Sequence, residues 1–328
     1  MKQLVLALLA LISFNLHAGS YAAREDVQAF IAEMQIRHGF DAEQLGVLFG
    51  KTRSIPAVLK AIAPPTDPRV KSWKNYRARF IEPKRMAAGL TFWQRHAATL
   101  AKAEALTGVP AEIIVAIIGI ETIYGKHLGR FDSFAALTTL AFDYPPRAPL
   151  FRRELEALLL LAREENRPPD SYRGSFAGAI GLPQFLPSSI RAYAIDFDGD
   201  GRIDLTGSPE DAIGSVANFL KLHGWETGGP VAVAVKVGAG ETAHEALIAE
   251  GILPNRRPLE IASMGVEIPP DAPEAPAALI DLVTPDAPTE YWLGYQNFYV
   301  ITRYNRSSFY AMAVWQFAQT LKGRRLEQ

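Results

Sequence analysis

A single carboxylate ends a long uncharged stretch in the middle of the chain. Residues 113–120 carry no charge, and Glu121 follows them directly. Pro110 favours the start of a helix here, and a helix that is apolar on nearly all sides must be buried. Burial disfavours the charged form of a carboxyl group, so we expect a raised pKa for Glu121. Such an acid can protonate the leaving oxygen of a sugar linkage. The alternative is a structural glutamate that pairs with an arginine.

A second group of carboxylates has the spacing of a metal loop. Residues 196–204 read Asp-Phe-Asp-Gly-Asp-Gly-Arg-Ile-Asp. Acids at positions 1, 3, 5 and 9 with glycine at position 6 are typical of the first part of an EF-hand calcium loop. Position 12, where an EF-hand has an acid, is Gly207, and the nearest later acids are Glu210 and Asp211. We expect a longer loop that binds Ca²⁺ structurally; the alternative is an Asp/Gly turn without a ligand.

Two other stretches have compositions that suit a binding surface. Residues 174–182 contain three glycines and two alanines, which allow the backbone to approach a ligand or another element closely. Residues 73–80 read Trp-Lys-Asn-Tyr-Arg-Ala-Arg-Phe. This aromatic and cationic run predicts either a solvated helix face with aromatic anchors or one wall of a sugar-binding cleft.

Length and composition limit the class of protein. The 328 residues suffice for two or three domains. Residues 1–18 have a basic start and an apolar run from Leu4 to Ile12, which predicts a secretory signal cleaved after Ala18, or alternatively after Ala22. Without the signal, 33 basic and 35 acidic residues remain, a formal charge of −2 (33 − 35). This balance argues against nucleic acid as a partner, and no other long apolar run predicts a membrane span.

Apolar periodicity and capping residues predict a mostly helical chain. Asp41 with Gln44, Ser188 and Asn305 are expected to begin helices. Pro64 to Pro68 predict an extended connection. Helices are expected within 24–62 and at 73–80, 83–107, 110–125, 131–142, 150–164, 190–194, 208–223, 243–250 and 306–321, strands at 231–237 and 278–283, and a hairpin of 291–293 with 298–301.

Four motifs occur in a fixed order: Glu121-Thr-x-Tyr-Gly, Ser175 to Phe185, the aspartate loop, and Ile301 to Asn305. Together they resemble the membrane-bound lytic murein transglycosylase B family (glycoside hydrolase family 103), along about residues 27–317. The resemblance implies a mainly α (α+β) fold with a lysozyme-like helical core. The expected segments are a signal peptide (1–18), an N-terminal helical domain (19–108), the catalytic core with the calcium loop (109–225), a small β subdomain (226–299) and a C-terminal helix that closes the core (300–328).

The same resemblance implies roles for individual residues. Glu121 corresponds to the catalytic acid/base of the family. The implied substrate contacts are Ser175, Gln184, Tyr76, Tyr304, Asn305 and Tyr310, and the implied calcium ligands are Asp196, Asp198, Asp200, Arg202 through its carbonyl, and Asp211. Each substrate contact also has a structural alternative: the tyrosines as packing aromatics, Ser175 as a turn cap, and Gln184 as a bridge between backbone groups.

The implied activity is cleavage of the β-1,4 bond between N-acetylmuramic acid and N-acetylglucosamine without water, with a 1,6-anhydro product. Ordinary hydrolysis needs a second carboxylate, for which Asp132 and Asp143 are the nearest later candidates. A muramidase that uses water and a non-catalytic peptidoglycan-binding protein remain the alternatives. The implied ligands are glycan strands and a structural Ca²⁺. Since the chain has no cysteine for a lipid anchor, we expect a soluble protein in the periplasm.

Overall fold

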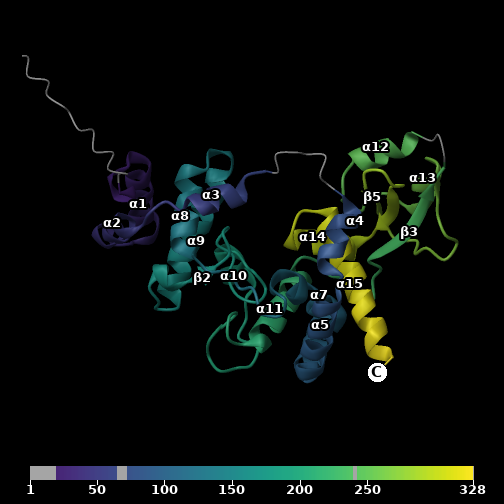
Figure 1. Cartoon of the computed structure of the whole chain (residues 1–328), viewed down its shortest axis with the longest axis horizontal. Helices are drawn as coiled ribbons and strands as arrows, with labels where there is room; N and C mark the ends of the chain where they lie inside the picture. Colours follow the sequence, from purple (N-terminus) through teal and green to yellow (C-terminus); the bar gives the residue numbers. More distant parts are fainter. Residues whose placement is uncertain (1–19, 65–71, 239–241, 328) are drawn as a thin grey trace, which may run out of the picture.

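Helices make up most of the structure, and one small sheet lies at one end (Figure 1). The computed structural model describes residues 20–64, 72–238 and 242–327. The expected signal peptide, and the expected extended connection beyond Pro64, lie outside the described residues. The helices are α1 (Glu25–His38), α2 (Ala42–Lys51), α3 (Pro56–Ile62), α4 (Trp73–Phe80), α5 (Pro83–Arg95), α6 (Ala97–Thr107), α7 (Ala111–Thr122), α8 (Ser133–Asp143), α9 (Ala148–Glu164), α10 (Pro187–Tyr193), α11 (Pro209–Leu222), α12 (Ala243–Ala249), α13 (Pro258–Ala262), α14 (Gln296–Tyr304) and α15 (Ser308–Leu326).

Helix α7 is the central element of the core. Every residue from Ala111 to Ile120 is buried, as its uncharged sequence predicts. Helices α5, α6, α11 and α15 pack around it. Pro110 is its N-cap, and Glu112 in its first turn pairs with Lys322 of α15 at 2.8 Å. The apolar stretch therefore specifies a helix enclosed by other helices. Glu121 is the first residue along this helix whose side chain is partly exposed rather than buried.

The end of α7 differs from the prediction. The helix was expected to continue to Gly125, but it ends at Thr122 because Ile123 (φ 51°) and Tyr124 (φ 56°) adopt the left-handed conformation. Tyr124 therefore turns back over the helix, and a Cβ added at Gly119 would lie 2.3 Å from its hydroxyl. The helix expected at 110–125 would place Tyr124 one turn after Glu121, and this expectation is wrong. A β-branched residue with this φ is strained, and nothing in the local sequence signals it.

The sheet is antiparallel with the strand order β4-β3-β6-β5. The predicted hairpin is wrong: residues 291–293 lie in β6, but 298–301 lie in helix α14. A short apolar run suits a helix face as well as a strand, and Phe298 and Ile301 are one turn apart and both fully buried. The strands are β3 (Ala232–Val237), β4 (Val266–Glu267), β5 (Ala278–Leu282) and β6 (Glu290–Gly294), with a separate antiparallel pair of β1 (Phe131–Asp132) and β2 (Arg173–Gly174).

Other local predictions were partly right. Asp41 caps α2 by accepting from the backbone N–H groups of Glu43 and Gln44, as expected. The single helix expected at 83–107 is interrupted at His96. The His96 ring packs at a tilt of 44° against that of Phe92 and contacts Glu210 at 3.1 Å.

Two predicted helix caps are wrong. Ser188 does not cap α10, because its hydroxyl donates to Glu154 at 2.7 Å. Asn305 does not cap the last helix either: it ends α14, and Ser307 caps α15 by accepting from the backbone N–H of Tyr310.

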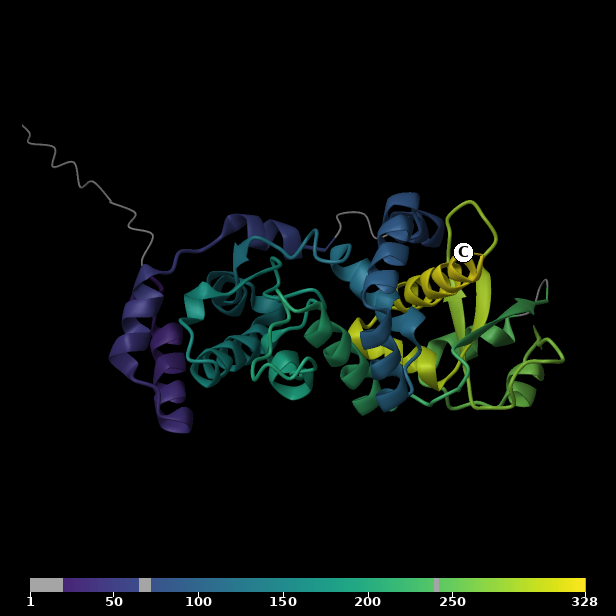
Figure 2. The same cartoon turned by 90° about the horizontal axis from the view of Figure 1, so that it is seen from below.

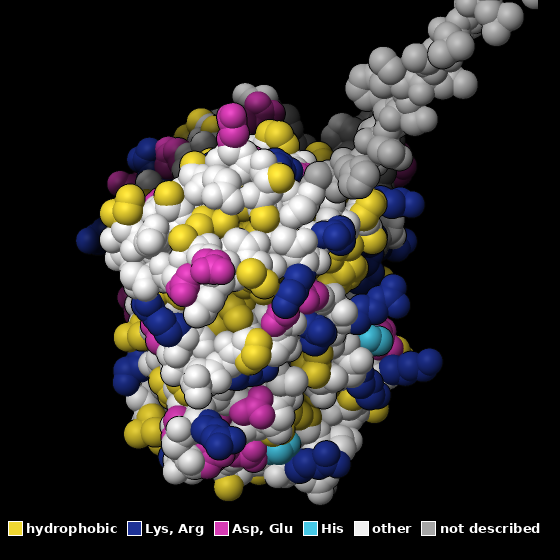
Figure 3. Space-filling view, turned by 90° about the vertical axis from the view of Figure 1, so that its left-hand side faces the viewer, with side chains coloured by type: hydrophobic (Ala, Val, Ile, Leu, Met, Phe, Trp, Pro, Cys, Tyr) yellow, Lys and Arg dark blue, Asp and Glu magenta, His cyan; other side chains and the backbone are white. Residues whose placement is uncertain are grey.

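The molecule is long, with α1 and α2 at one end and the sheet at the other (Figures 1 and 2). On the face at the N-terminal end, basic and acidic side chains are interspersed (Figure 3). Within the described residues, no single helix is long and apolar enough to cross a membrane; α6 and α7 are so only when taken together, and they meet at 115°.

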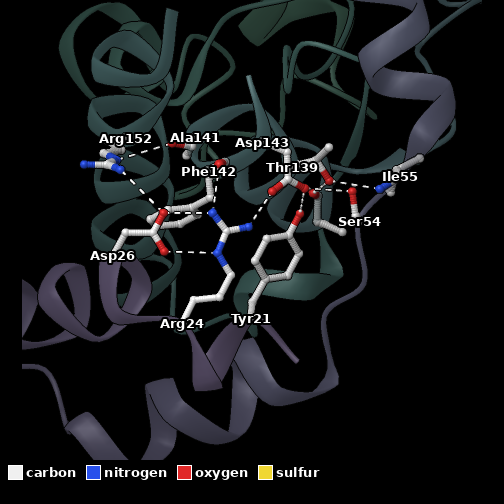
Figure 4. A network of polar contacts seen from close by, with 11 residues as sticks. Tyr21, Arg24, Asp26, Ser54, Ile55, Thr139, Ala141, Phe142, Asp143 and Arg152 are labelled. Carbon is white, nitrogen blue, oxygen red and sulfur yellow. Dashed lines mark hydrogen bonds and ion pairs between the residues drawn. The ribbon is translucent and has the colours of Figure 1, made fainter. Parts of the chain in front are cut away.

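A polar network fixes the N-terminal helices to α8 (Figure 4). The carboxylate of Asp143 accepts hydrogen bonds from Arg24 at 2.5 Å, from Ser54 at 2.8 Å and from the Tyr21 hydroxyl. Arg24 also pairs with Asp26 at 2.8 Å. Asp143 is mostly shielded from solvent, so water competes little for these hydrogen bonds. The bonds connect segments that are more than eighty residues apart in sequence.

We expect Asp143→Ala to lower the free energy of unfolding by about 1–3 kcal/mol, because it leaves three donors without their acceptor. Thermal or urea unfolding would measure the change. Glu33→Ala is the matched control, because it removes an exposed pair with Arg37 and should leave the free energy of unfolding nearly unchanged. Equal losses for the two variants would contradict this role of Asp143.

Candidate active site

The carboxyl of Glu121 is recessed between helices α7 and α15. Oε1 accepts a hydrogen bond of 2.6 Å from the hydroxyl of Tyr310, which is itself buried. The glutamate side chain is crowded by protein atoms yet keeps a partly exposed surface. The ion pairs between described residues do not include Glu121, whereas Glu112 on the same helix pairs with Lys322. The structural alternative of a glutamate paired with an arginine therefore finds no support.

The electrostatic surroundings of Glu121 favour its protonated form near neutral pH. Loss of solvation raises the pKa of its carboxyl to about 7, and the hydrogen bond from Tyr310 opposes this rise by stabilising the carboxylate. An acid with such a pKa is still substantially protonated at pH 7 and can also take a proton back. The apolar helix thus supplies the property that proton transfer to a leaving oxygen requires.

Two further tyrosines surround this carboxyl. The Tyr304 ring stacks on that of Tyr310, with centroids 6.3 Å apart and planes 11° from parallel. Tyr76 of α4 contacts Phe309 edge-on, and burial together with the charge of Glu121 raises its pKa to about 12. The pKa values of Tyr304 and Tyr310 are also raised by burial and by this charge, so all three hydroxyls remain protonated. The structure brings these predicted residues together around Glu121.

The glycine-rich loop, residues 174–184, is hydrogen-bonded to residues next to Glu121. Tyr304 donates to the carbonyl of Pro183 at 2.5 Å, and the Thr122 hydroxyl donates to the carbonyl of Leu182 at 3.0 Å. Thr122 also accepts from the N–H of Gly125, so it links the end of α7 to two loops. Sequence reasoning did not single out Thr122, although its place directly after the acid was a usable signal.

Ser175 and Gln184 stand at the two ends of this loop and both have structural contacts. Ser175 Oγ accepts from the backbone N–H groups of Ala177 and Ala179, as in a turn cap. The side-chain amide of Gln184 donates to the carbonyls of Leu128 and Gly181, and its backbone is left-handed (φ 51°). These contacts match the structural alternatives for both residues and leave a role toward substrate as a prediction.

Asn305 is exposed at the junction of α14 and α15, directly after Tyr304. Its carbonyl accepts from the N–H of Ser307, which positions the cap of α15 and, through that cap, the backbone of Tyr310. In the structure, Asn305 therefore stabilises this turn through its backbone carbonyl, and its contact with substrate stays a prediction.

The two candidates for a second carboxylate have other partners. Asp132 caps α8 by accepting from Ala135 at 3.0 Å and lies 3.5 Å from Arg173. Asp143 belongs to the network with Arg24. Both carboxylates therefore make structural contacts, and neither has the arrangement of the second catalytic carboxylate of a hydrolase.

The aspartate loop brings three carboxylates together. Oxygens of Asp196, Asp198 and Asp211 lie within 4.8 Å of one another, and Asp211 is buried. The predicted closing ligand, four residues after Gly207, is therefore near the first two. Asp211 accepts from the backbone of Phe197 at 2.7 Å, which ties helix α11 to the loop. Such a set of hard oxygens suits Ca²⁺.

The remaining predicted ligands lie outside this group of three carboxylates. Asp200 accepts from the backbone N–H of Arg202 at 2.8 Å. The backbone N–H of Gly201, followed by those of Gly199 and Asp200, lowers the pKa of Asp196, so its carboxylate is charged at neutral pH.

Comparisons with known proteins agree on one family. Residues 22–319 match the family model described as the transglycosylase SLT domain. The chain is 40% identical over 320 residues to membrane-bound lytic murein transglycosylase B of Escherichia coli, which covers 94% of this chain and 86% of that protein. Among solved structures, it is similar to soluble lytic transglycosylase SltB1 of Pseudomonas aeruginosa (47% identity, TM-score 0.84, 92% of this chain and 99% of that one). It is also similar to the E. coli lytic transglycosylase Slt35 in complex with calcium (41% identity, TM-score 0.81, coverage 94% and 96%).

The raised pKa of Glu121 predicts a pH-dependent cost in stability. The folded state binds the proton more tightly than the unfolded state, so stability falls as pH rises from about 4.5 to about 7. Glu121→Gln removes this cost, and we expect it to stabilise the protein by about 1–3 kcal/mol at pH 8. Thermal unfolding at pH 4 and pH 8 would show the gain only at the higher pH. A gain that is the same at both pH values would contradict a raised pKa.

Proposed function

This chain belongs to the transglycosylase SLT family of peptidoglycan-degrading lytic transglycosylases, and from this premise we propose that Glu121 is its catalytic acid and base. The observation that carries the proposal is the recessed carboxyl of Glu121, with a pKa of about 7 and a tyrosine rather than a cation as its partner. A carboxyl of this kind can give and recover one proton at neutral pH.

The proposed reaction uses this proton twice. Glu121 first protonates the oxygen between N-acetylmuramic acid and N-acetylglucosamine, and the bond from this oxygen to C1 of the muramyl residue breaks. The carboxylate, stabilised by the hydroxyl of Tyr310, then takes the proton of the muramyl 6-hydroxyl. That oxygen attacks C1 and closes a 1,6-anhydro ring. The glutamate is regenerated and no water is consumed.

The engagement of Asp132 and Asp143 in structural contacts supports a mechanism with one carboxylate. A muramidase would need a second carboxylate to activate water or to act as a nucleophile. An intramolecular hydroxyl makes this group unnecessary, because the nucleophile is already part of the bound sugar. Hydrolysis of the same bond by a muramidase is therefore the second candidate function. The reaction products distinguish it from the transglycosylase reaction.

We assign the surrounding residues to the binding of glycan strands. Tyr76, Tyr304 and Tyr310 form the aromatic surroundings of the acid. In this proposal, the loop from Ser175 to Gln184 and the exposed Asn305 contact the sugar chain with their remaining polar groups. The attachment of the loop to Thr122 and Tyr304 supports its place beside the acid.

We also propose that the aspartate loop holds a structural Ca²⁺. The carboxylates of Asp196, Asp198 and Asp211 would bind it, with Asp200 and the carbonyl of Arg202 completing the set. The ion would offset the repulsion between these charges and stiffen the start of α11. The calcium complex of the similar Slt35 supports this assignment.

The periplasm is the proposed location. Residues 1–18 have the composition of a secretory signal, and the substrate of the family lies outside the cytoplasmic membrane. The absence of cysteine supports a form without a lipid anchor on that residue.

Digestion of purified murein sacculi tests the reaction. The protein should release muropeptides that are lighter by one water than reducing-end products, as seen by mass spectrometry. Glu121→Gln should reduce turnover by about 100-fold or more, the usual contribution of a general acid. Glu112→Gln, on the same helix but paired with Lys322, is the matched control and should retain turnover. Products with reducing ends alone would identify a muramidase, and full turnover by Glu121→Gln would exclude its role as the acid.

Calcium should raise the midpoint of thermal unfolding, and a chelator should lower it, because an ion that binds the folded state alone stabilises it. Asp198→Ala should remove most of this response. Asp271→Ala, an exposed acid far from the loop in sequence, is the control and should leave the response intact. An unchanged midpoint with calcium and with chelator would remove the metal from the proposal.

A further inference from the structure

Two adjoining hollows lie where the sheet meets helices α4 and α15. Their volumes are about 600 and 510 Å³, and they share Pro288, Glu290 and Trp292. We call the continuous depression the helix–sheet groove. One half is lined by α4, α15 and the turn after β5, and the other half by β3 and β6. Each half is of the size that proteins use for small ligands.

The groove exists because helix α15 covers only part of one sheet face. Ala234 of β3, Trp292 of β6 and Ile280 of β5 are neighbours in register and lie on the same face. Ile280 is buried, since α15 packs over β5, whereas Ala234 is exposed. Trp292 lies at the border and is half-buried. The uncovered face therefore begins at an indole.

The lining combines flat aromatic rings with amide groups and with charged side chains of both signs. Trp292 and Trp315 are both partly exposed, and the indole nitrogen of Trp292 is buried without a hydrogen-bond partner among the described residues. Gln319 is exposed on the next turn of α15, and Arg77 of α4 donates to Gln316. An indole face beside amide and guanidinium donors is suited to a ligand with an apolar face and a polar rim. A pyranose ring has both.

The groove is distinct from the site at Glu121. Neither half is lined by Glu121 or by the three tyrosines around it. At about 100° per residue, Trp315 and Gln319 lie on the side of α15 opposite Tyr310. The catalytic carboxyl and the groove thus lie on two sides of the same helix.

We propose that the helix–sheet groove is a second binding site for a glycan strand of peptidoglycan, held by stacking on Trp292 and Trp315. The proposal rests on the proposed function for the identity of the polymer. Its extended form, with two halves that meet at Trp292, suits a chain of sugar rings better than a single compact ligand. A second attachment to an insoluble polymer would raise the local concentration of strands at Glu121.

The binding test uses sedimentation with purified sacculi and titration with a soluble β-1,4-linked N-acetylglucosamine oligomer. All proteins carry Glu121→Gln, so that no substrate is consumed. Trp315→Ala should weaken binding to sacculi about threefold to tenfold, the size expected for one lost aromatic contact. Gln319→Ala, which leaves both tryptophans in place, should also weaken binding to sacculi. Leu326→Ala is the matched control, because it truncates an exposed apolar side chain on the same helix outside the groove. Unfolding midpoints establish that each variant is folded.

A second measurement separates the groove from the catalytic site. With Glu121 intact, Trp315→Ala should keep its kcat and KM on a short soluble murein fragment and lose turnover on dilute sacculi. Equal binding of sacculi by Trp315→Ala, Gln319→Ala and Leu326→Ala would overturn the proposal. Loss of turnover on the short fragment would also overturn it, because the groove would then belong to the catalytic site. Retained turnover by Glu121→Gln would refute the proposed acid, and the variants would then be compared on the soluble oligomer, which contains no N-acetylmuramic acid and so lacks the bond that is cleaved.

Discussion

The desolvation of one carboxyl group is the constraint on which the structure of the site depends. A glutamate that is to hold a proton near neutral pH must be kept from water on most sides, and an uncharged helix is a direct way to achieve this. Helix α7 is enclosed by α5, α6, α11 and α15, so its last turn can carry an acid into an apolar environment. The hydroxyl of Tyr310 limits the rise in pKa to about 7. Burial and one neutral donor together set the acid within the range in which it can work in both directions.

The features that sequence predicted are those that depend on local pattern. The burial of α7 follows from its uninterrupted apolar stretch, and the cap at Asp41 follows from its neighbours. The alternation of aspartates predicted the closeness of Asp196 and Asp198, whereas the choice of Asp211 over Glu210 came from the resemblance to a family. Each of these depends on residues within about one helix length, where spacing determines geometry.

The features that sequence missed depend on contacts between distant segments or on strain. The bond between Tyr310 and Glu121 joins residues 189 positions apart, and it was not predicted: the resemblance to a family implied Tyr310 only as a substrate contact. The left-handed pair Ile123 and Tyr124 contradicts local preference and is maintained by the packing of Tyr124 between Gly89 and Gly119. Residues 298–301 suited either a strand or a helix, and burial against the core decided for the helix. Such outcomes are set by tertiary packing, which a local pattern does not contain.

The Asp143 network bears on the two cleavage positions that the sequence predicts near the N-terminus. Tyr21 stands only three residues after Ala18. Its side chain is buried and donates a hydrogen bond to Asp143. Processing after Ala18 leaves this tyrosine in the mature chain. Processing after Ala22 would remove it and would place the new terminal amine one residue before Arg24, beside the ion pairs that anchor α1. Of the two cleavage positions that the sequence predicts, the first preserves the contacts of Tyr21 with Asp143 and the second removes them.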